Sequence, residues 1–392
     1  MYKYDFNTIV ERKNTNSIKY DFNTERKMPL DVLPLWVADM DFETAPEIKE
    51  AILKRASHGI YGYTRPKPDF NNTIVNWMKK RHGLESRPEW YFYTPGVVFG
   101  MSMAIRALTK EGEGVLIQRP VYYPFSNIIT DNDRVLINNP LVYHKETLNY
   151  EMDLIDFEEK IINNNVKLFI LCNPHNPVGR VWTREELEGV GDICLKHGVK
   201  IVSDEIHEDF IYEGHTHIPF IKIKQEYEDI TIMCTSPSKT FNLAGLQISN
   251  LIVPNREIRM AIKKEIMKTG YDEPGTIGMV ACQAAYTWGE EWLEELKQYL
   301  TDNLNFVRQF LQEKLSKIKL VEPEGTYVIW LDFSGYGLSD EEINQKMIHE
   351  AKLWLDKGTM FGEEGEFFQR INIAAPRKTI EQALLALERA FV

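Results

Sequence analysis

Three short stretches of this chain carry side chains that could act together on one small molecule. NPHNPVGR follows an apolar run and contains Asn176, and SDEIHEDF follows the next apolar run and contains Asp204. CTSPSKTFNLAG follows a third run and contains Lys239, a single amine among small hydroxyl side chains. An amide, a carboxylate and an amine therefore each stand just beyond an apolar segment.

Each of these residues also has an ordinary explanation. Asn-Pro pairs make turns, an acidic residue at a strand end is usually a helix cap, and most lysines are surface charges. If the three apolar runs are neighbouring parallel strands, however, their carboxyl ends meet at one crevice. Pyridoxal phosphate (PLP) requires this set, because it takes a lysine for a Schiff base, a carboxylate for its ring nitrogen and donors for its oxygens.

The pattern along the chain predicts the elements that would hold these groups. A segment with a Thr-x-x-Glu capping box and a closing glycine, 183–198, predicts a helix between two of the runs. Alternation of strand and helix predicts an α/β fold with a mostly parallel central sheet covered by helices on both faces. The predicted strands are 112–120, 166–174, 198–205 and 230–239.

The C-terminal third has a different texture. One long amphipathic helix is predicted over 289–315, followed by the strand-like runs YVIWLDFSG and FQRINIAAP. These features predict a smaller α+β domain. The expected division is an N-terminal segment that joins the small domain (1–48), a large PLP-binding domain (49–287) and a small C-terminal domain (288–392).

Composition limits the classes of protein to consider. The 392 residues are 43% hydrophobic, so the chain can bury a large core and suggests about two domains. A net charge of −12 argues against a nucleic acid or an anionic membrane as partner. The four cysteines are far apart, which indicates neither a zinc site nor a disulfide framework. With no apolar run of membrane-spanning length, we expect a cytoplasmic enzyme of small molecules.

Together the motifs resemble the fold-type I PLP enzymes of the aminotransferase class I/II superfamily. WVADMDF, NPHNPVGR, SDEIHEDF and SPSKTFNLAGLQ resemble in particular the MalY/PatB group of cystathionine β-lyases, or C-S lyases. The resemblance implies an enzyme that cleaves cystathionine or other cysteine S-conjugates to a thiol, pyruvate and ammonia. An amino-acid aminotransferase is the alternative, because both reactions pass through the same carbanion, and a lyase with an added regulatory partner is a further one.

The resemblance assigns roles around the cofactor ring. Lys239 would form the Schiff base and move the substrate's α-proton, with its pKa lowered by the cationic ring. Asp204 would pair with the pyridine nitrogen, and Asn176 would donate to the phenolic oxygen. His207 stands where aspartate-type aminotransferases have a tyrosine that serves the same oxygen. The alternative for His207 is a helix-start histidine bonded to the backbone.

A glycine-containing turn that opens a helix, in YTPGVVFGMS, predicts an anion site for the phosphate. Ser236 is expected to add a hydroxyl, with Ser238 as a second candidate. Gln247 stands where many members of the superfamily have an arginine that clamps the phosphate, a departure that the MalY/PatB group shares. The backbone positions assigned to the phosphate are Gly96, Val97 and Val98.

The remaining assignments concern the substrate and the neighbouring subunit. Tyr122 matches the residue that stacks on the cofactor ring. Tyr63, with Tyr61 as its rival, matches the tyrosine that reaches the phosphate of a neighbouring subunit, which implies a homodimer with shared active sites. Arg370 matches the arginine that holds the substrate α-carboxylate as a planar fork, the alternative being a strand arginine paired with a surface acid.

Overall fold

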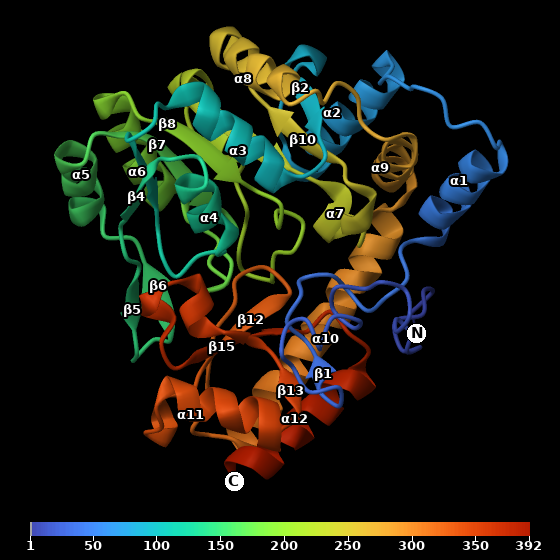
Figure 1. Ribbon diagram of the computed structural model, residues 1–392, viewed down its shortest axis with the longest axis vertical. Coiled ribbons are helices and arrows are strands. Elements are labelled where there is room, and N and C mark those ends of the chain that lie inside the picture. The colour runs from blue at the N-terminus through green and yellow to red at the C-terminus, as the bar shows by residue number, and fades with distance from the viewer. Residues whose placement is uncertain (1) are drawn as a thin grey trace.

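The computed structural model describes residues 2–392, and its centre is a seven-stranded sheet. The strand order is β2-β10-β9-β8-β7-β3-β4, and every neighbouring pair is parallel except the two that involve β10. Helices lie on both sides of this sheet (Figure 1). The predicted α/β fold is therefore confirmed. The strands are β2 (Tyr91–Thr94), β3 (Gly114–Ile117), β4 (Val135–Asn138), β7 (Val166–Cys172), β8 (Lys200–Asp204), β9 (Thr231–Thr235) and β10 (Ser249–Ile252).

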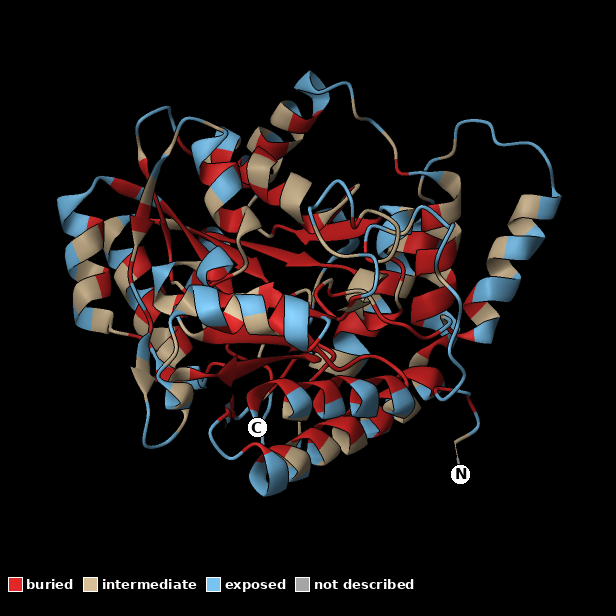
Figure 2. Cartoon of the chain, turned by 60° about the horizontal axis from the view of Figure 1, so that its bottom comes forward, coloured by how far each residue is buried: buried red, intermediate tan, exposed pale blue. Residues whose placement is uncertain are grey.

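Both faces of the central strands are buried, which explains their continuous apolar sequences. In β7, Leu168 and Ile170 pack in one core cluster with residues of α3 (Val97–Leu108), whereas Phe169 and Leu171 pack in another with residues of α6 (Arg184–His197). Successive side chains of a strand point to opposite faces, so this strand needs apolar residues at every position. Figure 2 shows the sheet as a buried layer between helices that are exposed on their outer faces.

The predicted helix between β7 and β8 is confirmed with its caps. Thr183 Oγ1 accepts a hydrogen bond from the Glu186 N–H, and the Glu186 carboxylate accepts one from the Thr183 N–H. Gly198 ends the helix with a φ of 70°, a left-handed conformation that favours glycine. The other helices on the large sheet are α4 (Pro124–Thr130), α5 (Leu154–Asn163), α7 (Pro237–Thr240) and α8 (Arg256–Lys268).

The C-terminal part contains a second, four-stranded antiparallel sheet of order β11-β12-β15-β14. Its strands are β11 (Lys319–Val321), β12 (Val328–Asp332), β14 (Asp356–Lys357) and β15 (Phe368–Asn372), with helices α10 (Glu290–Lys314), α11 (Asp340–Gln345) and α12 (Arg377–Phe391). A short hairpin, β5 (Val142–His144) and β6 (Asn149–Glu151), lies between β4 and α5. None of the helices formed by residues 2–392 is long and apolar enough to cross a membrane.

The N-terminal segment joins the C-terminal part, as Figure 1 shows. Its strand β1 (Leu33–Pro34) pairs in parallel with β13 (Leu353–Trp354). Three helices, α1 (Pro46–Ser57), α2 (Pro68–His82) and α9 (Thr276–Trp288), then pack together beside the large sheet. The predicted domain limits after residues 48 and 287 stay predictions.

Candidate active site

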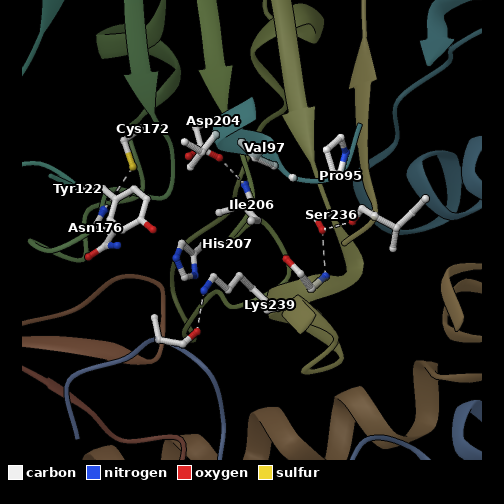
Figure 3. A pocket seen from close by; sticks show the side chains of 16 residues that line it. Pro95, Val97, Tyr122, Cys172, Asn176, Asp204, Ile206, His207, Ser236 and Lys239 are labelled. Carbon is white, nitrogen blue, oxygen red and sulfur yellow. Dashed lines mark hydrogen bonds between the residues drawn. The ribbon is translucent and has the colours of Figure 1, made fainter. Parts of the chain in front are cut away.

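One pocket lies at the carboxyl ends of β7, β8 and β9 and contains the three groups with which the sequence analysis began (Figure 3). Asp204 is the last residue of β8, Asn176 follows β7, and Lys239 lies on α7 directly after β9. The parallel register of the three strands explains this convergence. The pocket is lined by Ala38, Pro95, Gly96, Val97, Val98, Tyr122, Cys172, Asn176, Asp204, Ile206, His207, Ser236, Ser238, Lys239, Ala244 and Ile248.

Lys239 is held as a reactive amine. Its Nζ donates a hydrogen bond of 2.7 Å to the backbone carbonyl of Ala38. The Lys239 pKa is lowered to about 8, chiefly by burial and also by the positive charge of Arg370, while the carboxylates of Asp39 and Asp204 act in the opposite direction. A sizeable fraction of this amine is therefore unprotonated near neutral pH, whereas an ordinary lysine is almost fully charged. In the chain alone burial is the main cause of this lowering, and the predicted effect of the cationic ring stays a prediction.

Asp204 is a carboxyl group that keeps its proton unusually well. Burial raises its pKa to about 7, although a hydrogen bond from the Ile206 N–H, at 3.2 Å, and the charge of Lys239 both act in the opposite direction. Near neutral pH this group can hold a proton or release it to a base that contacts it. That property suits a partner of a pyridine nitrogen.

Arg370 and Asn176 are joined across the pocket wall. Arg370 Nη1 donates to Asn176 Oδ1 at 3.0 Å, and Arg370 Nη2 donates to the Trp36 carbonyl at 2.7 Å. Since the Asn176 oxygen is occupied by the guanidinium, its NH₂ group remains as the donor for a ligand oxygen. Arg370 also forms an ion pair with Asp356. That acid is buried, so the alternative of a surface ion pair does not describe Arg370.

His207 lies between the amine and the aromatic side of the pocket. Burial lowers its pKa well below the ordinary value, so the ring is neutral, and it forms a T-shaped contact with the Tyr327 ring at 5.7 Å between centroids. Within residues 2–392 its Nδ1 has no hydrogen-bond partner, which leaves the alternative of a backbone-bonded histidine without support. A neutral imidazole can donate one hydrogen bond to a ligand.

The predicted phosphate end of the pocket is the start of α3. Gly96 is the residue before the helix, no side chain caps its N–H groups, and a Cβ added at Gly96 would meet no atom within 4 Å. Free N–H groups at a helix start bind anions. Val97 and Val98 supply the first two N–H groups of the helix and also line the pocket.

The two serines before Lys239 differ in their availability. Ser236 Oγ donates to the Ile248 carbonyl at 2.8 Å and accepts from the Ser238 N–H at 3.0 Å, so its hydroxyl already caps α7. The Ser238 hydroxyl has no hydrogen-bond partner in the described part of the chain and lines the pocket. The Ser238 hydroxyl can therefore donate to a phosphate without breaking an existing hydrogen bond, whereas the Ser236 hydroxyl cannot. Gln247 is exposed and lies outside the pocket lining.

The predicted aromatic residues fall into two groups. Tyr122 lines the pocket, and its N–H donates to the Asn176 carbonyl at 3.0 Å, which ties the aromatic wall to the strand end. Tyr63 is fully exposed at 109% of its reference area and does not line this pocket. The Tyr61 hydroxyl donates a hydrogen bond of 2.5 Å to the Ala56 carbonyl, which lies at the end of α1. Tyr63 is the freer of the two.

The sequence analysis missed how the N-terminal segment closes the pocket. The carbonyl of Ala38, which receives the Lys239 hydrogen bond, also accepts one from the Tyr327 hydroxyl at 2.9 Å. Two acidic residues beside Ala38, Asp39 and Asp41, form an ion-pair network with two basic residues that come earlier in the N-terminal segment. These cations are Arg12 and Lys19, and Lys19 is completely buried. The acidic pair in WVADMDF was the available signal.

The pocket offers every group that PLP needs. An amine of lowered pKa, a carboxyl group that holds a proton and a free amide donor face one space, with uncapped helix N–H groups at one end and an aromatic wall. The residues present therefore fit this cofactor. Arg370 does not line the pocket itself; both of its Nη groups are bonded, and its buried Nε has no partner among the described residues.

Comparison with known proteins defines the class to which this fold and pocket belong. The family model "Aminotransferase class I and II" matches residues 31–387, so the chain belongs to this family. Cystathionine beta-lyase PatB of Bacillus subtilis is 42% identical over 386 residues, which span 98% of this chain and 99% of PatB. The resemblance to the MalY/PatB group is thereby confirmed.

Two solved structures resemble this chain closely. A PLP-bound putative aminotransferase from Clostridium difficile is 45% identical, with a TM-score of 0.96 and 99% of both chains covered. The PLP-bound C-S lyase from Staphylococcus hominis is 34% identical, with a TM-score of 0.92 and 99% of this chain and 98% of that chain covered.

Proposed function

We propose that this protein is a PLP-dependent carbon-sulfur β-lyase that cleaves cystathionine or other cysteine S-conjugates to a thiol, pyruvate and ammonia. One observation carries the proposal: the Lys239 amine, with its pKa lowered to about 8, shares a single pocket with Asp204. The charge of Arg370 contributes to this lowering of the Lys239 pKa. The family membership and the similarity to PatB support the proposal.

The binding roles follow from the hydrogen-bond donors that remain free. Lys239 would hold PLP covalently, Asp204 would supply the proton at its ring nitrogen, and the Asn176 NH₂ group would donate to its ring oxygen. The N–H groups at the start of α3, with Ser238, would hold the phosphate. When bound, PLP supplies an electron sink for the electron pair of the substrate's Cα–H bond.

The chain's own residues then perform the proton transfers. Arg370 orients the amino acid by its α-carboxylate, with Asp356 holding the guanidinium in place. Lys239, with its Nζ free and unprotonated, would take the α-proton of the substrate. The electron pair of the Cα–H bond would then form a Cα=Cβ bond while the Cβ–S pair leaves with sulfur as a thiolate, which takes up a proton. The released enamine then reacts with water to give pyruvate and ammonia.

Transamination is the second candidate, because it begins with the same α-proton transfer and the structure from Clostridium difficile is described as a putative aminotransferase. Purified enzyme with L-cystathionine and no keto acid separates the two. A β-lyase releases thiol and pyruvate, whereas L-methionine, whose sulfur is not on Cβ, should yield neither. Consumption of L-cystathionine that requires a keto acid, and that releases neither thiol nor pyruvate, would instead favour the aminotransferase.

The assembly and location belong to the same proposal. We propose a homodimer in which Tyr63 reaches the phosphate of the neighbouring subunit, supported by the complete exposure of Tyr63 on a segment without helix or strand. A cytoplasmic location is supported by four cysteines that are all buried and free. The proposed partner is a small-molecule amino-acid substrate, and neither a nucleic acid nor a membrane is proposed.

A further inference from the structure

Five titratable side chains gather next to the candidate active site without taking part in it. Glu205, Glu208 and Asp209 lie in the turn after β8, His82 ends α2, and His217 lies in the segment that follows the turn. Their functions are not explained by the proposed reaction, because none of them lines the pocket.

Three members of this group form what we call the imidazole-carboxylate cluster: His82, Glu208 and His217. One ligand atom from each lies within 4.8 Å of the ligand atoms of the other two. Their side chains are only 6%, 5% and 2% exposed. Ligands around a tetrahedral Zn²⁺ stand about 3.4 Å apart, since each bond is about 2.1 Å long. Small side-chain rotations would therefore complete such a set.

Four polar atoms of the cluster make no hydrogen bond within the described residues. His82 Nε2, Glu208 Oε2 and both ring nitrogens of His217 are buried without a hydrogen-bond partner. His217 Nε2 lies 3.0 Å from Glu205 Oε2, and His82 Nε2 lies 3.3 Å from Asp209 Oδ1, but neither contact has hydrogen-bond geometry. Burying polar atoms without partners costs free energy, so these atoms point to a missing ligand.

The charges around the cluster favour a cation. Asp209 has the guanidinium of Arg81 at 3.8 Å and the Thr240 hydroxyl at 2.8 Å as partners. The Glu208 carboxylate, by contrast, forms no ion pair with a lysine or arginine within residues 2–392. Its contact with a basic side chain is the one with the His82 imidazole, at 3.9 Å. Two imidazoles with a carboxylate are a ligand set that suits Zn²⁺ and related transition metals better than Mg²⁺ or Ca²⁺.

We propose that His82, Glu208 and His217 bind one divalent transition-metal ion, with Zn²⁺ as the best fit and water as its fourth ligand. The ion would link the end of α2 and the segment around His217 to the turn that carries His207. It would therefore stabilise the turn beside the candidate active site, independently of the reaction that the pocket performs.

The test uses PLP-loaded protein without an affinity tag, stripped with a chelator and dialysed against Zn²⁺. Metal content is measured by inductively coupled plasma mass spectrometry. We expect about one Zn²⁺ per chain in the wild type and in the control His215→Gln, which changes an exposed histidine outside the cluster. His82→Gln and Glu208→Gln should retain less than about a fifth of that amount. Equal retention by all four proteins, or none by the wild type, would overturn the proposal.

If circular dichroism shows that the variants do not fold, a second measurement on the wild type tests whether the metal site exists. In the wild type, Co²⁺ should give the visible ligand-field absorption of a four-coordinate site, and Zn²⁺ should displace it. Zn²⁺ should also raise the midpoint of thermal unfolding by about 3 °C or more, because a ligand that binds only the folded chain stabilises it. Absence of both effects would show that the site does not exist.

Discussion

Arg370 Nη1 donates a hydrogen bond of 3.0 Å to Asn176 Oδ1, and this contact joins the two sheets at the pocket. Arg370 lies on β15 of the small sheet, while Asn176 follows β7 of the large one. The bond fixes the orientation of the Asn176 amide, because the oxygen must face the guanidinium. A shift of the small sheet would therefore disturb the proposed carboxylate site and the proposed donor to PLP together.

The role of Arg370 predicts a selective loss of substrate binding. In Arg370→Lys the charge remains near Asp356, but the planar fork is lost. We expect kcat/KM for L-cystathionine to fall about 100-fold, chiefly through a higher KM, while the absorbance of bound PLP is kept. Arg308→Lys, which changes an arginine paired with Glu322 at the surface, is the matched control. A KM within twofold of the wild type would contradict the assignment.

The lowered pKa of Lys239 predicts how fast the cofactor-free chain takes up PLP. The amine reacts only when unprotonated, so with a pKa of about 8 the rate should rise about tenfold from pH 7 to pH 9 and then level off. The rate is followed by the absorbance of covalently attached PLP, and Lys239→Ala should show no such band. A rate that continues to climb to pH 10 would indicate an ordinary lysine.

The raised pKa of Asp204 predicts a change in stability with pH. Because burial raises this pKa from 3.8 to about 7 in the folded chain, the folded state binds more protons than the unfolded state between these values. Stability from this group is therefore lost as pH rises through that window.

Asp204→Asn keeps an acceptor for the Ile206 N–H but does not titrate. Relative to the wild type, its free energy of unfolding should rise by up to about 4 kcal/mol as pH increases from 4 to 7. Urea unfolding of the cofactor-free proteins across this range measures the difference. If the difference stays constant with pH, Asp204 does not have a raised pKa.

The sequence predicted the central sheet and the convergence on the pocket because both depend on local patterns. A strand such as β7, buried on both faces, must be apolar throughout, and parallel order brings the residues after each strand to one edge. The helix α6 could be placed nearly to the residue, since its capping box and closing glycine are written in the sequence.

Other features depend on contacts between distant residues and leave no such pattern. The bond between Arg370 and Asn176 spans 194 positions, and the contact between Lys239 and Ala38 spans 201. The sequence analysis placed Ser236 before Ser238 as a phosphate donor, because no local pattern shows that the Ser236 hydroxyl donates to the distant Ile248 carbonyl.

Shared active sites predict complementation between two defective subunits. Lys239→Ala and Tyr63→Ala are each expected to have little activity. If Tyr63 serves the neighbouring site, a mixed dimer of the two has one intact site, so random mixing should restore about a quarter of the wild-type activity. Tyr61→Phe, which removes the bond to the Ala56 carbonyl, should behave like the wild type. No recovery in verified mixed dimers would show that Tyr63 acts within its own subunit or not at all.

The stoichiometry of L-cystathionine cleavage tests the proposed β-lyase activity most directly. Enzyme loaded with PLP is incubated with L-cystathionine in the absence of any keto acid, and homocysteine and pyruvate are quantified over time. We expect both products in a 1:1 ratio and far beyond one turnover per active site, with Lys239→Ala inactive. Consumption of L-cystathionine that stops after about one turnover without homocysteine or pyruvate, and resumes only when a keto acid is added, would contradict the lyase and identify an aminotransferase.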